Sequence, residues 1–253
     1  MAGILATGIT LDRRVRLFID VGTNSEIVLG SSAKTLATAA PAGPAFEAAQ
    51  IRCGMRAADG AIEGVKIVDG EVELTVIGDV APVGLCGSGL VDAVAELVAA
   101  GVLDPSGRFV LGSSERLGKI GEENVFYLSD EVFLSQRDVR ELPFAKASIA
   151  TGWTILCKDL GVEPAEISQV LLGGSFGSYL SAASAVKIGL VPKLPLARIV
   201  SAGNVAGEGA KIAALSVTER AAAQAILEEV EYVELSGRTD FNDLFVDQLR
   251  FPE

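Results

Sequence analysis

The feature that most constrains the fold of this sequence is a strongly apolar run that ends in a carboxylate and a glycine. Residues 15–21 read Val-Arg-Leu-Phe-Ile-Asp-Val, so they predict a buried strand. The turn that follows contains Gly22, Thr23 and Asn24. The glycine lets the backbone approach an anion closely, the next two residues offer donors, and Asp20 could hold Mg²⁺ through water. An ordinary β-turn that begins with aspartate fits the same residues.

The spacing of apolar residues predicts further strands and helices along the chain. Residues 26–30 and 35–40 give two short strands after tight turns, which predicts an antiparallel meander with the first strand. Helices are expected over 90–100, 136–160, 204–215, 218–229 and 240–249, and strands over 167–172, 198–202 and 231–235. Three antiparallel strands followed by alternating helices and strands predict an α/β, ribonuclease H-like fold, of which actin-like ATPases contain two units facing a cleft.

Two stretches interrupt this pattern. Asp69 and Gly70 stand between alternating apolar residues and predict a type I′ hairpin. Residues 103–135 mix glycine, serine and charge, and we interpret them as an irregular insertion. The chain is therefore expected to form a single nucleotide-binding lobe over residues 1–253, with insertions at about 58–82 and 103–135.

The first of two further glycine-rich segments is Gly-Leu-Cys-Gly-Ser-Gly at 84–89, directly before an apolar helix. The backbone amides of Gly87, Ser88 and Gly89 would then point at an anion at the helix N-terminus. A tight turn with Ser88 as an ordinary N-cap is the alternative interpretation. No Gly-Lys-Ser/Thr follows, so this is not a P-loop.

The second segment is Val-Leu-Leu-Gly-Gly-Ser-Phe-Gly at 170–177, a buried strand that leads into a bend. Gly173 and Gly174, followed by Ser175, would let a flat ligand such as adenosine lie against bare backbone. Close packing of a helix on the strand is the alternative. The spacing does not match the dinucleotide-binding pattern.

One charged helix start could also reach a ligand. Asp138, Arg140, Glu141 and Lys146 lie on or near the beginning of the helix expected over 136–160. A solvated charged face is the simpler interpretation, but Lys146 is the side chain that could reach a nucleotide bordered by this helix.

Composition excludes several kinds of chemistry. Histidine is absent and the three cysteines are far apart, which excludes Ser-His-Asp and Cys-His catalysis and a thiol-held iron–sulfur or zinc site in this chain. The net charge of −12 disfavours binding to nucleic acid or to anionic membranes. No transmembrane helix or secretory signal is predicted, so we expect a cytoplasmic protein.

Taken in order, these segments resemble the C-terminal half of the reductive activators of corrinoid proteins. Those activators are ATP-dependent iron–sulfur proteins of the superfamily of acetate and sugar kinases, heat-shock chaperones and actin (ASKHA). The resemblance spans almost the whole chain, and it rests on residues 4–9, 18–27, 42–47, 53–57, 84–89, 138–140, 145–147, 173–177, 188–192 and 203–204.

The resemblance implies a role for each candidate segment. Residues 20–24 are similar to the second phosphate loop, with Asp20 as the candidate catalytic residue. Residues 173–175 are similar to the adenosine loop, and residues 87–89 to the helix start beside the nucleotide. ATP and Mg²⁺ are the implied cofactors, and a corrinoid protein of a methyl-transfer system is the implied partner of a homodimer. The implied activity is the ATP-dependent reduction of cob(II)alamin to cob(I)alamin.

The sequence departs from the family pattern in two respects. Ser25 stands where the family usually has glycine, which we expect to stiffen the turn slightly. The iron–sulfur domain and the first phosphate loop are not among these residues, so we expect a fragment, or a protein that needs a separate first half, and no activity alone. A dimerisation and corrinoid-protein docking module, or a small-molecule kinase of the same superfamily, are the alternative functions.

Overall fold

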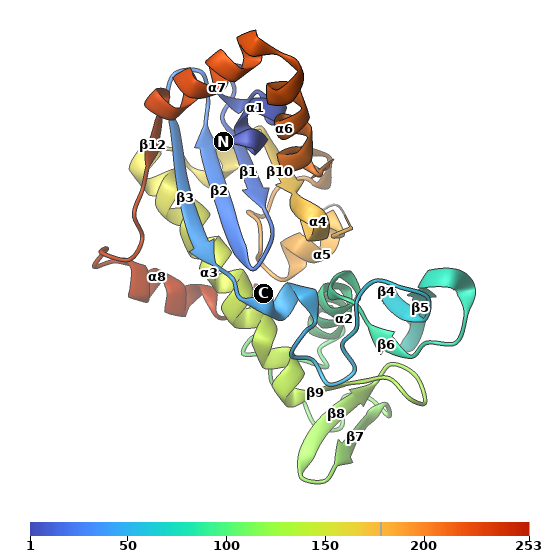
Figure 1. Cartoon of the computed structure of the whole chain (residues 1–253). Helices are drawn as coiled ribbons and strands as arrows, with labels where there is room; N and C mark the ends of the chain where they lie inside the picture. The colour runs from blue at the N-terminus through green and yellow to red at the C-terminus, as the bar shows by residue number, and fades with distance from the viewer. Residues whose placement is uncertain (178, 253) are drawn as a thin grey trace.

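A six-stranded mixed sheet forms the upper part of the molecule (Figure 1). The computed structural model describes residues 1–177 and 179–252. Along the sheet the strands are ordered β11 (Ile199–Gly203), β10 (Gln169–Gly173), β1 (Arg16–Asp20), β2 (Asn24–Gly30), β3 (Thr35–Pro41) and β12 (Val230–Tyr232). Strands β1, β2 and β3 pair antiparallel, while β10 joins β1, β11 joins β10 and β12 joins β3 in parallel. The predicted meander is confirmed.

Strand β1 is buried on both faces of the sheet, which explains its continuous apolar run. Successive side chains of a strand point to opposite faces. Leu17 and Ile19 belong to the larger core cluster, whereas Phe18 packs in a smaller cluster with Ile4 and Val205.

Helices cover the two faces of this sheet. Helix α3 (Gln136–Leu160) packs on β2 and β3 on one face. Its bounds confirm the predicted helix, and both ends are locally encoded by a Ser135–Asp138 capping box and by Gly161 at φ 72°. The small cluster on the other face includes residues of α1 (Ala2–Thr7), α6 (Val205–Leu215) and α7 (Val217–Glu229). The remaining short helices near this sheet are α4 (Gly174–Gly177), α5 (Ala182–Lys187), η1 (Ile9–Leu11), η4 (Pro164–Glu166) and η5 (Leu196–Arg198).

Residues 42–135, between β3 and α3, build the lower part of the molecule (Figure 1). The predicted hairpin is confirmed, since Asp69 and Gly70 have φ of 52° and 86°, as a type I′ turn requires. The part contains η2 (Pro44–Glu47), β4 (Ala61–Val68), β5 (Glu71–Val76), η3 (Ile77–Asp79), β6 (Gly84–Leu85) and α2 (Gly87–Ala99), with strands ordered β5-β4-β6.

The interpretation of residues 103–135 as irregular is wrong. A three-stranded antiparallel sheet forms there from β7 (Leu117–Ile120), β8 (Glu123–Tyr127) and β9 (Phe133–Ser135). These strands are short and only Val125, Phe126 and Leu134 among their large apolar side chains are buried, so their hydrophobic pattern is weak.

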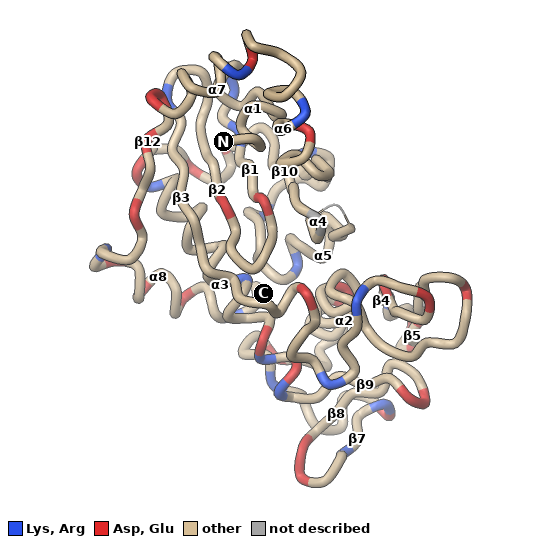
Figure 2. Tube along the Cα trace, viewed as in Figure 1, with Lys and Arg blue, Asp and Glu red and all other residues tan. Residues whose placement is uncertain are grey.

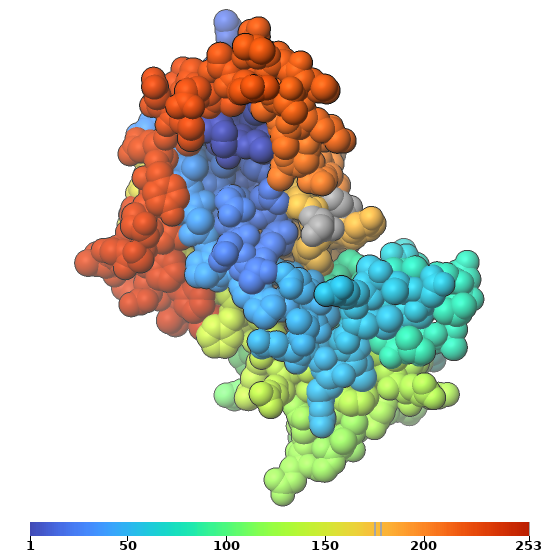
Figure 3. Space-filling model, in the orientation of Figure 1, coloured from blue at the N-terminus to red at the C-terminus, as the bar shows by residue number. Residues whose placement is uncertain are grey.

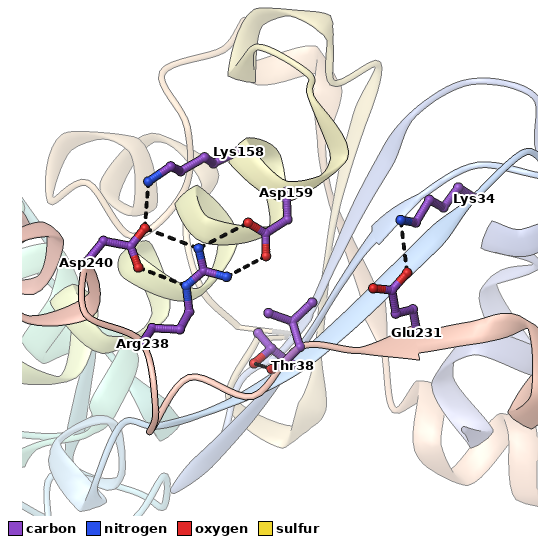
Figure 4. Close-up of polar contacts among 8 residues, drawn as sticks. Lys34, Thr38, Lys158, Asp159, Glu231, Arg238 and Asp240 are labelled. Atoms are coloured by element: carbon purple, nitrogen blue, oxygen red, sulfur yellow. Dashed lines mark hydrogen bonds and ion pairs between the residues drawn. The ribbon is translucent and has the colours of Figure 1, made fainter.

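The C-terminal segment connects the sheet to α3 by contacts with both. After β12, the carbonyl of Val233 accepts a 2.7 Å hydrogen bond from Thr38, and helix α8 (Phe241–Gln248) then packs on α3. Between them, Arg238 forks onto Asp159 and Asp240 (Figure 4). Within the described residues, no helix has the length and apolar character needed to cross a membrane.

We expect Arg238→Ala to lower the free energy of unfolding by about 1–2 kcal/mol, because it removes a bidentate ion pair that also joins Asp240. The Arg238 and Asp159 side chains are only 24% and 27% exposed. The matched control is Lys34→Ala, which removes a 51%/61% exposed pair with Glu231 and should cost about 0.5 kcal/mol or less (Figure 4). Urea denaturation measures the free energy of unfolding of both variants. Equal losses would contradict a larger stabilising effect of the Arg238 ion pairs.

Candidate functional site

The carboxyl end of β1 brings two carboxylates together. Asp20 lies opposite Glu26 in the register of β1 and β2, and it lies beside Gly173 in the register of β1 and β10. The backbone N–H of Val21 donates a 3.0 Å hydrogen bond to the Gly173 carbonyl, which fixes the two strand ends to each other. Figure 2 shows acidic positions on the neighbouring strands β1 and β2.

Burial raises the pKa of Asp20 above its ordinary value. The pKa of Glu26 is raised as well, by burial first and then by the negative charge of Asp20. A cation beside these neighbouring carboxylates would favour their charged forms. Glu26 was not among the predicted site residues, although two strands joined by a tight turn place residues equidistant from the turn opposite each other.

The turn between β1 and β2 is attached to the segment that follows β3. The carbonyl of Thr23 accepts hydrogen bonds from the N–H groups of Ala42 (3.1 Å) and Gly43 (2.9 Å). The Thr23 hydroxyl donates to the carboxylate of Glu47, at the end of η2. The turn and this segment are continuous on the surface (Figure 3). The predicted phosphate turn is thus held in place from outside its own hairpin, and Asn24 is exposed beside it.

Ser25 is fully buried and tied to the turn it follows. Its hydroxyl donates to the Gly22 carbonyl at 3.2 Å and accepts from the Gly22 N–H at 3.4 Å. These contacts give a physical basis for the expected stiffening of the turn.

Gly173 and Gly174 are both required by close contacts within the fold. A Cβ at Gly174, which has φ +93°, would lie 2.6 Å from Asp20 Oδ1. At Gly173 it would lie 2.7 Å from Val205 and 2.8 Å from Phe18, so this glycine serves close packing, the alternative left open by the sequence. The backbone of Ser175 belongs to α4, while its side chain lies outside the described residues.

The start of α2 is also tightly packed. A Cβ at Gly87 would lie 1.7 Å from the Phe46 carbonyl oxygen, and one at Gly89 would lie 2.1 Å from that of Ile62. The helix begins at Gly87, three residues before its predicted start. Ser88 as the N-cap is wrong, because Cys86 occupies that position and Ser88 is buried in the first turn.

A cavity of about 1020 Å³ lies beside these elements. Phe46 and Phe176 form an aromatic pair in its wall, with ring centroids 5.1 Å apart. Its volume suits a ligand of nucleoside size. Gly87 and Ser88 contribute to the wall and Gly89 does not. The full lining is Phe46, Glu47, Ala48, Ala49, Gly54, Met55, Arg56, Ala57, Glu63, Thr75, Val76, Ile77, Gly78, Asp79, Cys86, Gly87, Ser88, Phe176 and Tyr179.

Lys146 lies away from this cavity wall. Its side chain is buried, its amine donates to the Arg250 carbonyl and lies 5.5 Å from the centre of the Phe251 ring, and burial lowers its pKa to about 8. Lys146 therefore anchors the C-terminal segment. Lys146 is not part of a solvated charged face. The geometry also gives no support to its predicted role in nucleotide binding.

The family model described as the C-terminal domain of RACo, the ASKHA domain, matches residues 14–253. The chain belongs to this family. The actin-like fold and the resemblance stated from the sequence are confirmed.

Three relatives of this RACo-type ASKHA domain show how much of a larger protein it spans. The corrinoid activation enzyme RamQ of Eubacterium limosum is 34% identical over 96% of this chain and 44% of its own length. The reductase of the Co(II) methylated amine-specific corrinoid protein of Methanosarcina barkeri is 26% identical over 81% of this chain and 39% of its own. The solved structure of a reductive activator for corrinoid, iron-sulfur protein superposes with a TM-score of 0.91 at 36% identity, covering all of this chain and 42% of that one. The chain thus spans less than half the length of these relatives.

We expect Gly87→Ala to destabilise the ASKHA domain by about 1–3 kcal/mol, because its methyl group would overlap the Phe46 carbonyl and force η2 and α2 apart. Gly237→Ala is the matched control, since nothing lies within 4 Å of an added Cβ there and its φ needs no glycine. Thermal unfolding measures both variants. Equal melting temperatures would show that the contact between η2 and α2 is not tight.

The raised pKa of Asp20 predicts a pH effect on stability. The folded state binds this proton more tightly than the unfolded chain does. The contribution of Asp20 to the free energy of unfolding is therefore fully present at low pH and falls as the pH rises from the ordinary value through the raised pKa. Asp20→Asn removes this fall. Urea titrations of both proteins at several acidic pH values give the difference, and a difference that stays flat or changes in the opposite direction would contradict it.

Proposed function

We propose that this chain is the nucleotide-binding part of an ATP-dependent reductive activator, which converts the cob(II)alamin of a corrinoid methyl-transfer protein to cob(I)alamin. The observation that supports it best is the link between Thr23 and Glu47. It joins a turn of phosphate-binding type, beside Asp20, to a cavity of nucleoside size. The relatives named as corrinoid activators support the same function.

The residues at the end of β1 and in the following turn have a definite place in this proposal. Asp20 would hold Mg²⁺ through water, since among the described residues no group of three acidic or cysteine side chains is gathered for direct ligation. The chemistry that the cation would supply there is neutralisation of charge on the phosphates. The turn that contains Gly22, Thr23 and Asn24 would lie beside the phosphates, while the cavity that Gly87 and Phe176 line would receive the nucleoside.

The electron in this proposal comes from outside the described residues. Cys53, Cys86 and Cys157 are all free, and the last two are buried in different helices or helix caps. Burial also raises the pKa of Cys157 to about 12, so this thiol is a poor ligand for an iron–sulfur cluster. In this proposal the chain binds nucleotide and the corrinoid partner, within a cytoplasmic homodimer.

Asp20→Ala should abolish the Mg²⁺-dependent ATPase activity of the complete polypeptide, because it removes the carboxylate that holds the cation beside the phosphates. Asp243→Ala, an exposed carboxylate at the start of α8, is the control and should retain full turnover. A phosphate-release assay at saturating Mg²⁺ measures both. Unchanged turnover in Asp20→Ala would remove Asp20 from the catalytic site.

Titration calorimetry tests the proposed function as a whole. In this titration the complete polypeptide should bind ATP and ADP in the presence of Mg²⁺. In a separate assay it should support reduction of a cob(II)alamin-loaded corrinoid protein by a low-potential donor. Failure to bind either nucleotide would overturn the proposal.

A further inference from the structure

Glu47 contacts both halves of the candidate site. One of its carboxylate oxygens, Oε1, accepts the hydrogen bond from the Thr23 hydroxyl in the turn after β1. The same side chain lines the cavity whose wall contains the Phe46–Phe176 pair. It is exposed, so a ligand in the cavity has access to it.

A nucleotide has a fixed linear order of phosphates, ribose and base. If the phosphates lie at the Thr23 turn and the base lies in the aromatic cavity, then the ribose must lie at the boundary between them, where Glu47 stands. We infer that Glu47 is the residue that recognises the ribose, by accepting a hydrogen bond from a ribose hydroxyl. This inference rests on the proposed nucleotide-binding function.

The chemistry of the side chain fits this role. An ionised carboxylate only accepts hydrogen bonds, and its two oxygens provide about four lone-pair positions. Thr23 occupies one of them, and the second oxygen, Oε2, has no hydrogen-bond partner among residues 1–177 and 179–252. Ribose hydroxyls are donors, and bonds from them to a charged acceptor are stronger than neutral ones. An acidic residue serves the ribose 2′-hydroxyl in the same way in dinucleotide-binding folds.

The position of Glu47 is well defined by its neighbours. It ends the 3₁₀ helix η2, whose Phe46 carbonyl lies against Gly87 so closely that no side chain fits there. The N–H groups of the preceding Ala42 and Gly43 donate hydrogen bonds to the Thr23 carbonyl. A hydrogen-bonding group held by a rigid backbone discriminates well, because an analogue that lacks the hydroxyl leaves it unpaired.

A simpler role is that Glu47 only holds the Thr23 turn in shape. The two roles differ in what they predict for nucleotide analogues. A carboxylate that acts only through Thr23 affects ATP and its deoxy forms equally. A carboxylate that bonds the ribose distinguishes them.

The test is titration calorimetry of the complete polypeptide with Mg²⁺ and ATP, 2′-deoxy-ATP or 3′-deoxy-ATP. The wild-type protein should prefer ATP over at least one deoxy form by roughly tenfold or more. Glu47→Ala should bring this ratio close to one, while Glu47→Gln, which keeps the shape and one acceptor, should retain part of it. Thr23→Val is the matched control: it removes the hydrogen bond to Glu47 but leaves the carboxylate, so it should weaken all three nucleotides and keep the ratio.

Three results would overturn the inference while leaving the proposed function intact. They are a wild-type ratio near one with measurable ATP binding, an unchanged ratio in Glu47→Ala, and a ratio lost equally in Thr23→Val. Absence of ATP binding in the wild-type protein is a different outcome, and it would overturn the proposed function together with the inference.

Discussion

The parallel pairing of β1 with β10 is the constraint on which the site depends. The two strands are separated by almost 150 residues, yet they pair in register from Arg16 opposite Gln169 to Asp20 opposite Gly173. Parallel neighbours need a crossover connection. Here that crossover contains the β2–β3 hairpin, the whole lower part of the molecule and α3 (Figure 1). The pairing therefore determines both the position of Asp20 at the end of β1 and the position of the cavity-forming elements relative to Asp20.

Close backbone contacts at glycines complete this arrangement. Gly174 lies against Asp20 and Gly87 lies against the Phe46 carbonyl, so the loop after β10 packs closely on the end of β1, and α2 packs closely on η2. The sequence suggested that these glycines leave room for a ligand. In the structure Gly87, Gly89 and Gly173 leave room for other parts of the protein. Room for a ligand arises beside them, in a cavity that larger side chains such as Phe46 and Phe176 line.

Features encoded by nearby residues could be predicted from the sequence, and features made by distant ones could not. Helix α3 carries its own capping box and its own terminal glycine, so both ends were predicted correctly. Asp20 could be proposed as a site residue because its strand and turn are contiguous. Glu47 reaches Thr23 only through the fold, 24 positions apart. Lys146 follows several charged residues in the sequence. It is buried in the fold because Arg250 and Phe251, more than 100 residues later, pack against it.

The charges at the site bear on how a nucleotide would enter it. Asp20 and Glu26 lie opposite each other with raised pKa values, and Glu47 is hydrogen-bonded to Thr23 in the turn between their strands. A triphosphate brought to this turn would meet repulsion from like charge at short range. In the proposed function, a divalent cation held through water by Asp20 would offset this repulsion. Under the same proposal, binding of nucleotide and of Mg²⁺ would therefore be coupled, each raising the affinity for the other by the same factor.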